Sequence, residues 1–236
     1  MDQGKLRVYA AELLGTFTLV FIGTTAIAGS ALIGAPPLLV APFAFGLALL
    51  AGLYAFGEVS GGHFNPAVSI AMFLDKRLPS SDLAGYLVSQ FAGAILASLV
   101  LLIATSKHQV ALTATTPSSD GAAFVIEFVM TALFVLVILQ ASRSERFGPS
   151  ALVAIPLTLL AIHFAAIPFS GSSVNPARTF GPALVGNVWT GIWIYFIAPP
   201  LGAAVGWAIH AGVVSGTLGP AESPVAETLE ETHTAQ

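Results

Sequence analysis

The chain has no cysteine and little charge. Only 8% of its 236 residues are charged and 56% are hydrophobic, whereas about a quarter of the residues are charged in a typical soluble domain. The absence of cysteine excludes disulfides, thiolate catalysis and thiolate metal sites. The shortage of charge, together with a mean hydropathy of +0.86, excludes an ordinary soluble domain and indicates a protein that crosses a membrane several times.

Patterns typical of catalysis are scarce as well. None of the five His residues has an evident carboxylate partner, and no nucleophile motif or metal-ligand spacing occurs. Three of the four Asp residues fall outside the apolar stretches, and Asp82 is the first residue of one. We therefore expect no catalytic residue, metal, cofactor or nucleic-acid partner, and we do not expect an enzyme.

Six apolar stretches are long enough to span a bilayer. They cover approximately residues 8–33, 38–58, 82–105, 121–142, 150–168 and 191–215. The first stretch follows Lys5 and Arg7 and contains Ala26-Ile27-Ala28, so it also resembles a signal peptide with its cleavage site. Its apolar run continues past a usual signal core, and we interpret it as the first spanning helix.

The basic residues indicate the orientation in the membrane. Six of the eight fall on one side, which the positive-inside rule makes cytoplasmic: Lys5, Arg7, Lys76, Arg77, Arg143 and Arg146. Both termini are therefore predicted to be cytoplasmic, in the plasma membrane or, in a bacterium, the inner membrane. We expect a short N-terminal segment (1–7), one transmembrane domain (8–216) and an acidic tail (217–236), whose Pro, Thr and Glu content predicts disorder.

The tripeptide Asn-Pro-Ala occurs twice, each time after an apolar segment: Asn65-Pro66-Ala67 and Asn175-Pro176-Ala177. Asn is a favoured N-cap and Pro a favoured first helical residue, so each tripeptide predicts the start of a helix. Residues 66–74 are apolar except for Ser69. At about 1.5 Å per residue they reach ~13 Å, about half of a hydrocarbon core of ~30 Å. Two half-length helices are therefore expected within the membrane.

The two halves of the chain repeat each other. Ser60-Gly61 precedes the first tripeptide as Ser170-Gly171 precedes the second, with one offset of 110 residues, and Glu12-x-x-x-Thr16 has its counterpart in Glu127-x-x-x-Thr131. Each copy, about 8–105 and about 121–215, holds three spans, so the second copy enters the membrane from the opposite face. The copies are then related by a pseudo-two-fold axis in the membrane plane, and the half-helices meet near the midplane.

These segments resemble the two signature loops of the aquaporin (major intrinsic protein) family: residues 60–69 read SGGHFNPAVS and residues 173–178 read SVNPAR. The resemblance covers about residues 8–215. It implies an all-α membrane protein with six transmembrane helices and two re-entrant half-helices in an inverted repeat. It also implies a homotetramer in the lipid bilayer, with one pore per subunit and water as the permeant.

The resemblance assigns a selectivity filter to Phe45, His163, Ser172 and Arg178, and a pore-lining position to His63. The combination of Phe, His and Arg is similar to that of water-selective members, whereas glycerol-conducting members carry a small residue in place of His163. Ser172 is smaller than the Cys or Thr common at its position, which widens the expected aperture. From the residues alone, His163 is equally well explained as a core residue. Arg178 would cost at least about 2.5–3.5 kcal/mol inside a membrane, which indicates a functional cavity.

Each Asn of the two tripeptides is predicted to have two roles, one for its side-chain oxygen and one for its amide nitrogen. Its side-chain oxygen caps its own half-helix, and its amide nitrogen keeps two N–H groups for the pore. A water molecule that accepts from Asn65 and Asn175 cannot accept a proton from its neighbour. Glu12 and Glu127 are interpreted as buried structural acids that accept backbone N–H groups of the re-entrant loops; a proton relay is the alternative.

We expect a passive channel that conducts water in single file and excludes protons and ions. The alternatives are a channel for glycerol, hydrogen peroxide or ammonia and, less favoured, a secondary transporter, since inverted repeats build those too. Coupled transport would need an acid or a cluster of oxygen ligands near the midplane, where this sequence offers two Asn and apolar residues.

Overall fold

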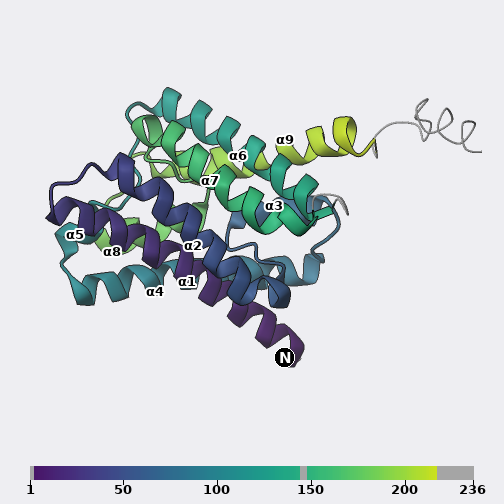
Figure 1. Ribbon diagram of the computed structural model, residues 1–236, viewed down its shortest axis with the longest axis horizontal. Coiled ribbons are helices and arrows are strands. Elements are labelled where there is room, and N and C mark those ends of the chain that lie inside the picture. The colour runs from purple at the N-terminus through teal and green to yellow at the C-terminus, as the bar shows by residue number, and fades with distance from the viewer. Residues whose placement is uncertain (1–2, 144–147, 217–236) are drawn as a thin grey trace, which may run out of the picture.

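Six long helices make up most of the chain. The computed structural model describes residues 3–143 and 148–216, and six helices in this part are long and apolar enough to cross a membrane. The predicted spans and the all-α fold class are confirmed, and the described residues contain no strand. The predicted tail, 217–236, lies outside the described residues. The long helices (Figure 1) are α1 (Gln3–Leu32), α2 (Pro37–Ser60), α4 (Ser80–Ala104), α6 (Asp120–Arg143), α7 (Gly148–Ser170) and α9 (Ile192–Ile209), which continues into a π-helical turn (His210–Val214).

Two short helices begin at the predicted prolines. These are α3 (Pro66–Leu74), with 9 residues, and α8 (Pro176–Gly186), with 11 residues. At about 1.5 Å per residue they extend ~13 to 17 Å, so neither crosses a bilayer of ~30 Å. Each is capped by the Asn before it, whose side chain accepts a backbone N–H of the first turn.

A further short helix, α5 (Lys107–Ala111), lies between α4 and α6 and was not predicted. The hydroxyl of Ser106 accepts a hydrogen bond from the backbone N–H of Gln109 at 3.2 Å. The spacing Ser-x-x-Gln is typical of a capping box. It is the local signal in the sequence that indicates this helix.

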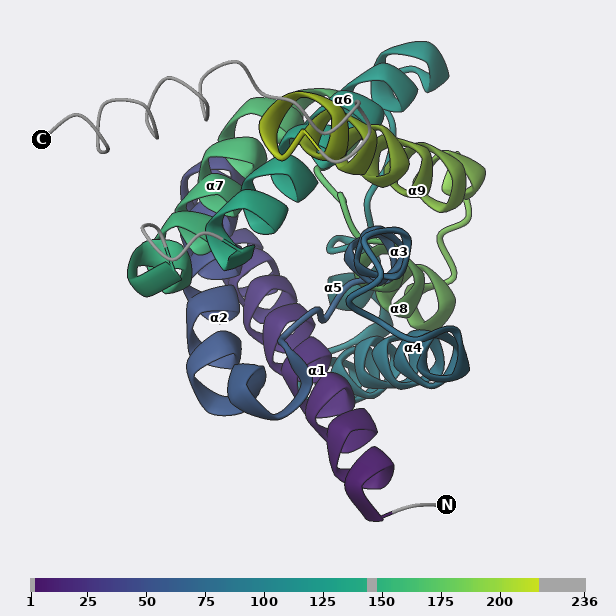
Figure 2. The ribbon, with the colours of Figure 1, turned by 90° about the vertical axis from the view of Figure 1, so that its right-hand side faces the viewer.

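The two copies of the repeat interlock through the half-helices. Within the copies, α1 packs against α2 and α4, and α6 packs in the same way against α7 and α9. In contrast, the half-helix α3 of the first copy packs mainly against α9 of the second copy. The half-helix α8 of the second copy packs mainly against α4 of the first. Figure 2 shows α3 and α8 between α9 and α4, on the side of the bundle away from α2 and α7. The contacts therefore keep the same form when the copies are exchanged, as expected for an inverted repeat.

Two symmetric glycines let the helices of each copy approach closely. A Cβ atom on Gly93 of α4 would lie 2.3 Å from the carbonyl oxygen of Leu13 in α1, and one on Gly202 of α9 would lie 2.2 Å from that of Phe128 in α6. No larger residue fits at either contact. Close backbone packing of this kind stabilises helix pairs where lipid supplies little hydrophobic driving force.

The start of α1 and the end of α9 lie at one end of the bundle, opposite α5 (Figure 1). At this end, Lys5 forms an ion pair with Asp82 at the start of α4. The guanidinium of Arg77 donates a hydrogen bond to the hydroxyl of Ser142, in the last turn of α6, at 2.9 Å. Lys5 and Arg77, basic residues from two segments, therefore lie at the end that the sequence predicts to be cytoplasmic.

Candidate functional site

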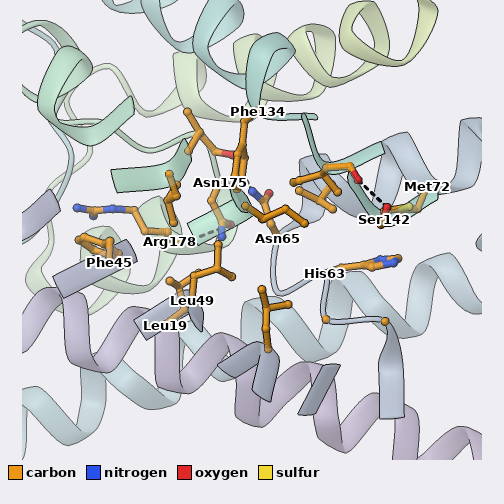
Figure 3. Close-up of a pocket in the computed structure, with 18 of the residues that line it drawn as sticks. Leu19, Phe45, Leu49, His63, Asn65, Met72, Phe134, Ser142, Asn175 and Arg178 are labelled. Carbon is orange, nitrogen blue, oxygen red and sulfur yellow. Dashed lines mark hydrogen bonds between the residues drawn. The ribbon is translucent and has the colours of Figure 1, made fainter. Parts of the chain in front are cut away.

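Asn65 and Asn175 lie side by side in the middle of the bundle (Figure 3). The amide nitrogen of Asn65 donates to the carbonyl of Val174 at 2.8 Å, and that of Asn175 donates to the carbonyl of Phe64 at 2.9 Å. Each Asn therefore ties its half-helix to the loop that precedes the other. The prediction of two free N–H groups per Asn is wrong, because this cross-link uses one of them and leaves one.

Glu12 of α1 holds the loop that precedes α3. Its carboxylate is fully buried and accepts four hydrogen bonds, from the hydroxyl of Ser60 (2.7 Å), the backbone N–H groups of His63 (3.0 Å) and Phe64 (2.8 Å), and the amide of Gln90 (2.7 Å). All four partners are placed to donate, an arrangement that suits the ionised carboxylate, an acceptor at both oxygens. Irregular backbone at membrane depth requires such partners, since no lipid group replaces them.

Glu127 of α6 holds the loop that precedes α8. It accepts hydrogen bonds from the hydroxyl of Ser170 (2.6 Å) and from the backbone N–H groups of Ser173 (2.8 Å) and Val174 (2.7 Å). Val174 has φ 46°, and its counterpart Phe64 has φ 50°, a region in which bulky and β-branched residues are rare. The two buried acids therefore hold strained turns, and such strain concentrates at functional sites.

An elongated cavity passes along the two half-helices. It has about 60 Å³ of space for the centres of water-sized molecules, which at ~10–15 Å³ per water is room for about four to six waters. Most of its wall is apolar, and the loops before α3 and α8 supply polar groups. Figure 3 shows Arg178 and Phe45 at one end, Asn65 and Asn175 in the middle, and His63 toward the other end.

Phe45, His163 and Arg178 meet at one end of this cavity. The rings of Phe45 and His163 stack with their centroids 4.8 Å apart, and Cζ of Arg178 lies 4.7 Å from the centroid of Phe45. Arg178 is only 2% exposed, and one of its guanidinium N–H groups donates to the carbonyl of Thr113 at 3.0 Å. Its Nε has no partner within the described part of the chain. A buried cation with unused donors next to a cavity is suited to hydrogen-bonding a small polar solute.

The other two predicted site residues differ in position. Ser172 is buried but is not among the residues that line the cavity, and its hydroxyl has no hydrogen-bond partner in residues 3–143 and 148–216. Its filter role stays a prediction. His63 lines the cavity, and its ring packs against that of Tyr86 with centroids 4.9 Å apart.

Sequence reasoning missed the residues that support the site. Gln90 contacts Glu12, Ser69 lies beside His63, and the carbonyl of Thr113 holds Arg178. A polar residue in the middle of an apolar span is itself a signal, so Gln90 was detectable. Thr113 takes part through its backbone, which no side-chain pattern reveals. The described residues contain no group of three or more His, Asp or Glu side chains that could hold a metal.

The fold and the site together define a multi-pass membrane protein of the channel type, built from an inverted repeat around two capped half-helices. The model of the family described as "Major intrinsic protein" matches residues 2–210. The chain therefore belongs to the major intrinsic protein family, the aquaporin family, as its signature loops predicted.

The relatives of this chain carry names of two kinds. The chain is 38% identical to "Glycerol uptake facilitator protein-like 6" of Lactiplantibacillus plantarum over 206 aligned residues. The alignment covers 84% of this chain and 94% of that relative. The chain is 39% identical to "Aquaporin Z" of Photorhabdus laumondii over 226 aligned residues. This alignment covers 87% of this chain and 96% of that relative. The names of these relatives therefore do not decide between water and glycerol, and the predicted preference for water stays a prediction.

The fold also matches a solved structure. The X-ray structure of the aquaglyceroporin from Plasmodium falciparum superposes with a TM-score of 0.81 at 24% sequence identity, covering 89% of this chain and 97% of that chain. This similarity shows that the two proteins share a fold.

Proposed function

We propose that the protein is a passive channel for small uncharged solutes, with water among them, that excludes protons and ions. The observation that carries the proposal is the pair Asn65 and Asn175. Both line one cavity, and each keeps one amide N–H after capping its helix and cross-linking the loops. Two N–H donors, one from each half of the chain, can therefore donate to a solute at the same point of a narrow, mostly apolar passage.

A water molecule at this point accepts one hydrogen bond from each Asn. Both of its lone pairs are then used, so it donates to its two neighbours in the row and accepts from neither. A proton that moves along a row of waters must be accepted by each water in turn. The two fixed donors therefore interrupt proton transfer while water itself passes.

The half-helices add an electrostatic barrier at the same place. The N-termini of α3 and α8 point at the Asn pair, and each carries about half a positive elementary charge. The same barrier against protons and cations is described for aquaporin-type pores. The guanidinium of Arg178, 2% exposed, adds a full positive charge at one end of the cavity.

The contacts of the filter favour small solutes. Phe45 touches both His163 and Arg178, with spacings of 4.8 Å and 4.7 Å, so three bulky side chains share one cross-section. Within the proposal, this geometry favours water over glycerol. Glycerol or another small neutral solute is the second candidate, because a relative of 38% identity is named a glycerol uptake facilitator-like protein.

The test is the flux of water, glycerol and hydrogen peroxide into vesicles that contain the purified protein, followed by light scattering. We expect fluxes above those of protein-free vesicles that do not saturate and do not depend on a proton or sodium gradient. Saturation, or dependence on such a gradient, would contradict a channel. Glycerol flux equal to water flux would contradict the preference assigned to the filter.

The double variant His163→Ala, Arg178→Val tests the location of the filter. Removing both side chains should widen the passage and raise glycerol flux several-fold, on the order of 10-fold for about 1.4 kcal/mol of barrier. His108→Ala is the matched control, because His108 is exposed and outside the cavity lining. Unchanged glycerol exclusion in a folded double variant would mean that the constriction lies elsewhere.

The assembly and the orientation belong to the same proposal. We propose a homotetramer in the plasma membrane, or in the inner membrane of a bacterium, with both termini cytoplasmic. The arrangement of 1–7, 8–216 and 217–236 as N-terminal segment, channel domain and tail is likewise proposed. The position of Lys5 and Arg77 at one end of the bundle supports the orientation.

A further inference from the structure

A chain of hydrogen bonds connects the buried acid Glu12 to His63 in the cavity wall. The amide nitrogen of Gln90 lies 2.7 Å from Oε2 of Glu12 and 2.8 Å from the hydroxyl oxygen of Ser69. The same hydroxyl oxygen lies 3.1 Å from Nδ1 of His63. These four side chains come from α1, α4, α3 and the loop before α3, so the fold assembles the chain of contacts from distant segments.

The donors and acceptors fix where each hydrogen lies. Glu12 accepts three other hydrogen bonds, and the nitrogen of the Gln90 amide is the atom that faces its Oε2, so the NH₂ of Gln90 donates to the carboxylate. That NH₂ has two hydrogens, and they go to Glu12 and to Ser69. Ser69 therefore accepts from Gln90, and its own hydrogen is left for His63.

We propose that Gln90 is a positioning residue that, through Ser69, fixes the tautomer of His63. A Ser69 hydroxyl that donates to Nδ1 requires an unprotonated Nδ1, so neutral His63 carries its hydrogen on Nε2. His63 lines the cavity and is partly exposed to it. The imidazole therefore offers the passing solute a hydrogen-bond donor at a point where the surrounding wall is mostly apolar.

The consequence for transport rests on the proposed function. Between the Asn pair and the end of the cavity that holds His63, each water accepts from the water before it and donates to the next. Such a water has one spare lone pair and one spare hydrogen, so a donor in the wall binds the lone pair and an acceptor binds the hydrogen, and the row stays intact in either case. The tautomer of His63 thus decides whether the wall offers the row a donor or an acceptor at this point.

The second copy of the repeat has no histidine at the position that corresponds to His63, and its hydrogen bonds differ. Ser173 and Thr179 stand at the positions that His63 and Ser69 occupy in the first copy, 110 residues earlier. The hydroxyl of Thr179 donates to that of Ser173 at 2.6 Å, and Ser173 donates to the carbonyl of Asn175 at 2.7 Å. This network ends on the backbone, so the tautomer control belongs to the first copy alone.

Nitrogen-15 solid-state NMR of the full chain, labelled at histidine and embedded in lipid vesicles at neutral pH, tests the proposal. The His63 signals are assigned by their loss in His63→Gln. We expect His63 with Nε2 protonated and Nδ1 unprotonated. His163 is the internal reference, because its Nδ1 lies 3.0 Å from the carbonyl of Leu159, which only accepts, so His163 must show the opposite tautomer. A hydrogen on Nδ1 of His63 overturns the proposal.

The variant Gln90→Met tests the role of Gln90 itself. Without the amide, the Ser69 hydroxyl is free to accept from Nδ1, so the ratio of the Nδ1–H to the Nε2–H form should rise by about 5- to 150-fold, the effect of one buried hydrogen bond. Ser89→Ala, a neighbour on α4 outside this network, should leave the ratio unchanged. An unchanged ratio in Gln90→Met overturns the role of Gln90. The spectra do not depend on flux, so a protein that conducts nothing would refute the proposed function and leave this result readable.

Discussion

Replacing Glu127 by Ala should destabilise the protein more than almost any other single change. The substitution leaves two buried donors without an acceptor, the backbone N–H groups of Ser173 and Val174. The hydroxyl of Ser170 loses its shorter bond and keeps the carbonyl of Ala166 at 3.3 Å. Each unpaired buried donor costs about 1–3 kcal/mol, so the expected loss is about 2–6 kcal/mol. The strained turn at Val174, φ 46°, would also lose its anchor.

Two matched variants on the same helix make the expectation specific. Glu127→Gln keeps one acceptor oxygen and turns its NH₂ toward the N–H of Val174, so it should cost about 1–3 kcal/mol. Thr131→Val removes a buried hydroxyl one turn away that has no hydrogen-bond partner in the described part of the chain, so it should be neutral or slightly stabilising.

The assay is the thermal midpoint of the purified protein in detergent, followed by circular dichroism. For a chain of this size, 1 kcal/mol corresponds to roughly 2–4 °C. Glu127→Gln should therefore lower the midpoint by about 2–12 °C, and Glu127→Ala by more or to the point of not folding. A midpoint for Glu127→Ala equal to that of the wild type, or equal losses for Ala, Gln and Thr131→Val, would refute the reasoning.

Three further changes have expected outcomes in the same assay. Gly202→Ala should lower the midpoint through overpacking of about 1–3 kcal/mol, whereas Gly29→Ala should be tolerated because nothing lies within 4 Å of its Cβ position; equal effects would contradict the close helix contact. Asn175→Ala should cost about 1–3 kcal/mol, because it removes a helix cap and the cross-link between the loops; a neutral result would show that neither stabilises the fold. Asp82→Asn should cost no more than ~1 kcal/mol, since its ion pair with Lys5 is partly exposed, and a larger loss would indicate a buried role.

Local rules account for the parts of the fold that could be predicted. Asn is a favoured N-cap and Pro a favoured first helical residue, so α3 and α8 begin at Pro66 and Pro176 as expected. The six spans follow from length and hydropathy, and the inverted topology follows from an odd number of spans per copy. Gly93 and Gly202 each begin a pair of small residues four positions apart, with Ala97 and Gly206, and this spacing is typical of close helix contacts.

Contacts between distant segments account for most of what could not be predicted. One amide N–H of Asn65 is used by a carbonyl 109 residues away, so counting its free donors required the folded arrangement. The partner of Arg178 is a backbone carbonyl of Thr113, and backbone groups leave no mark in a sequence. The connection of Gln90 to His63 depends on how α1, α3 and α4 meet. The width of the filter depends on side-chain packing at Phe45, which residue types do not determine.

The most direct test of the central claim is to measure water flow and proton flow in the same vesicles that contain the purified protein. Light scattering reports the response to an osmotic step, and an enclosed pH-sensitive dye reports the response to a pH step. The two donors of the Asn pair and the two half-helix N-termini predict water permeability well above that of protein-free vesicles, with no added proton permeability. A proton leak that increases with the amount of protein, or the absence of added water flow, would contradict the account.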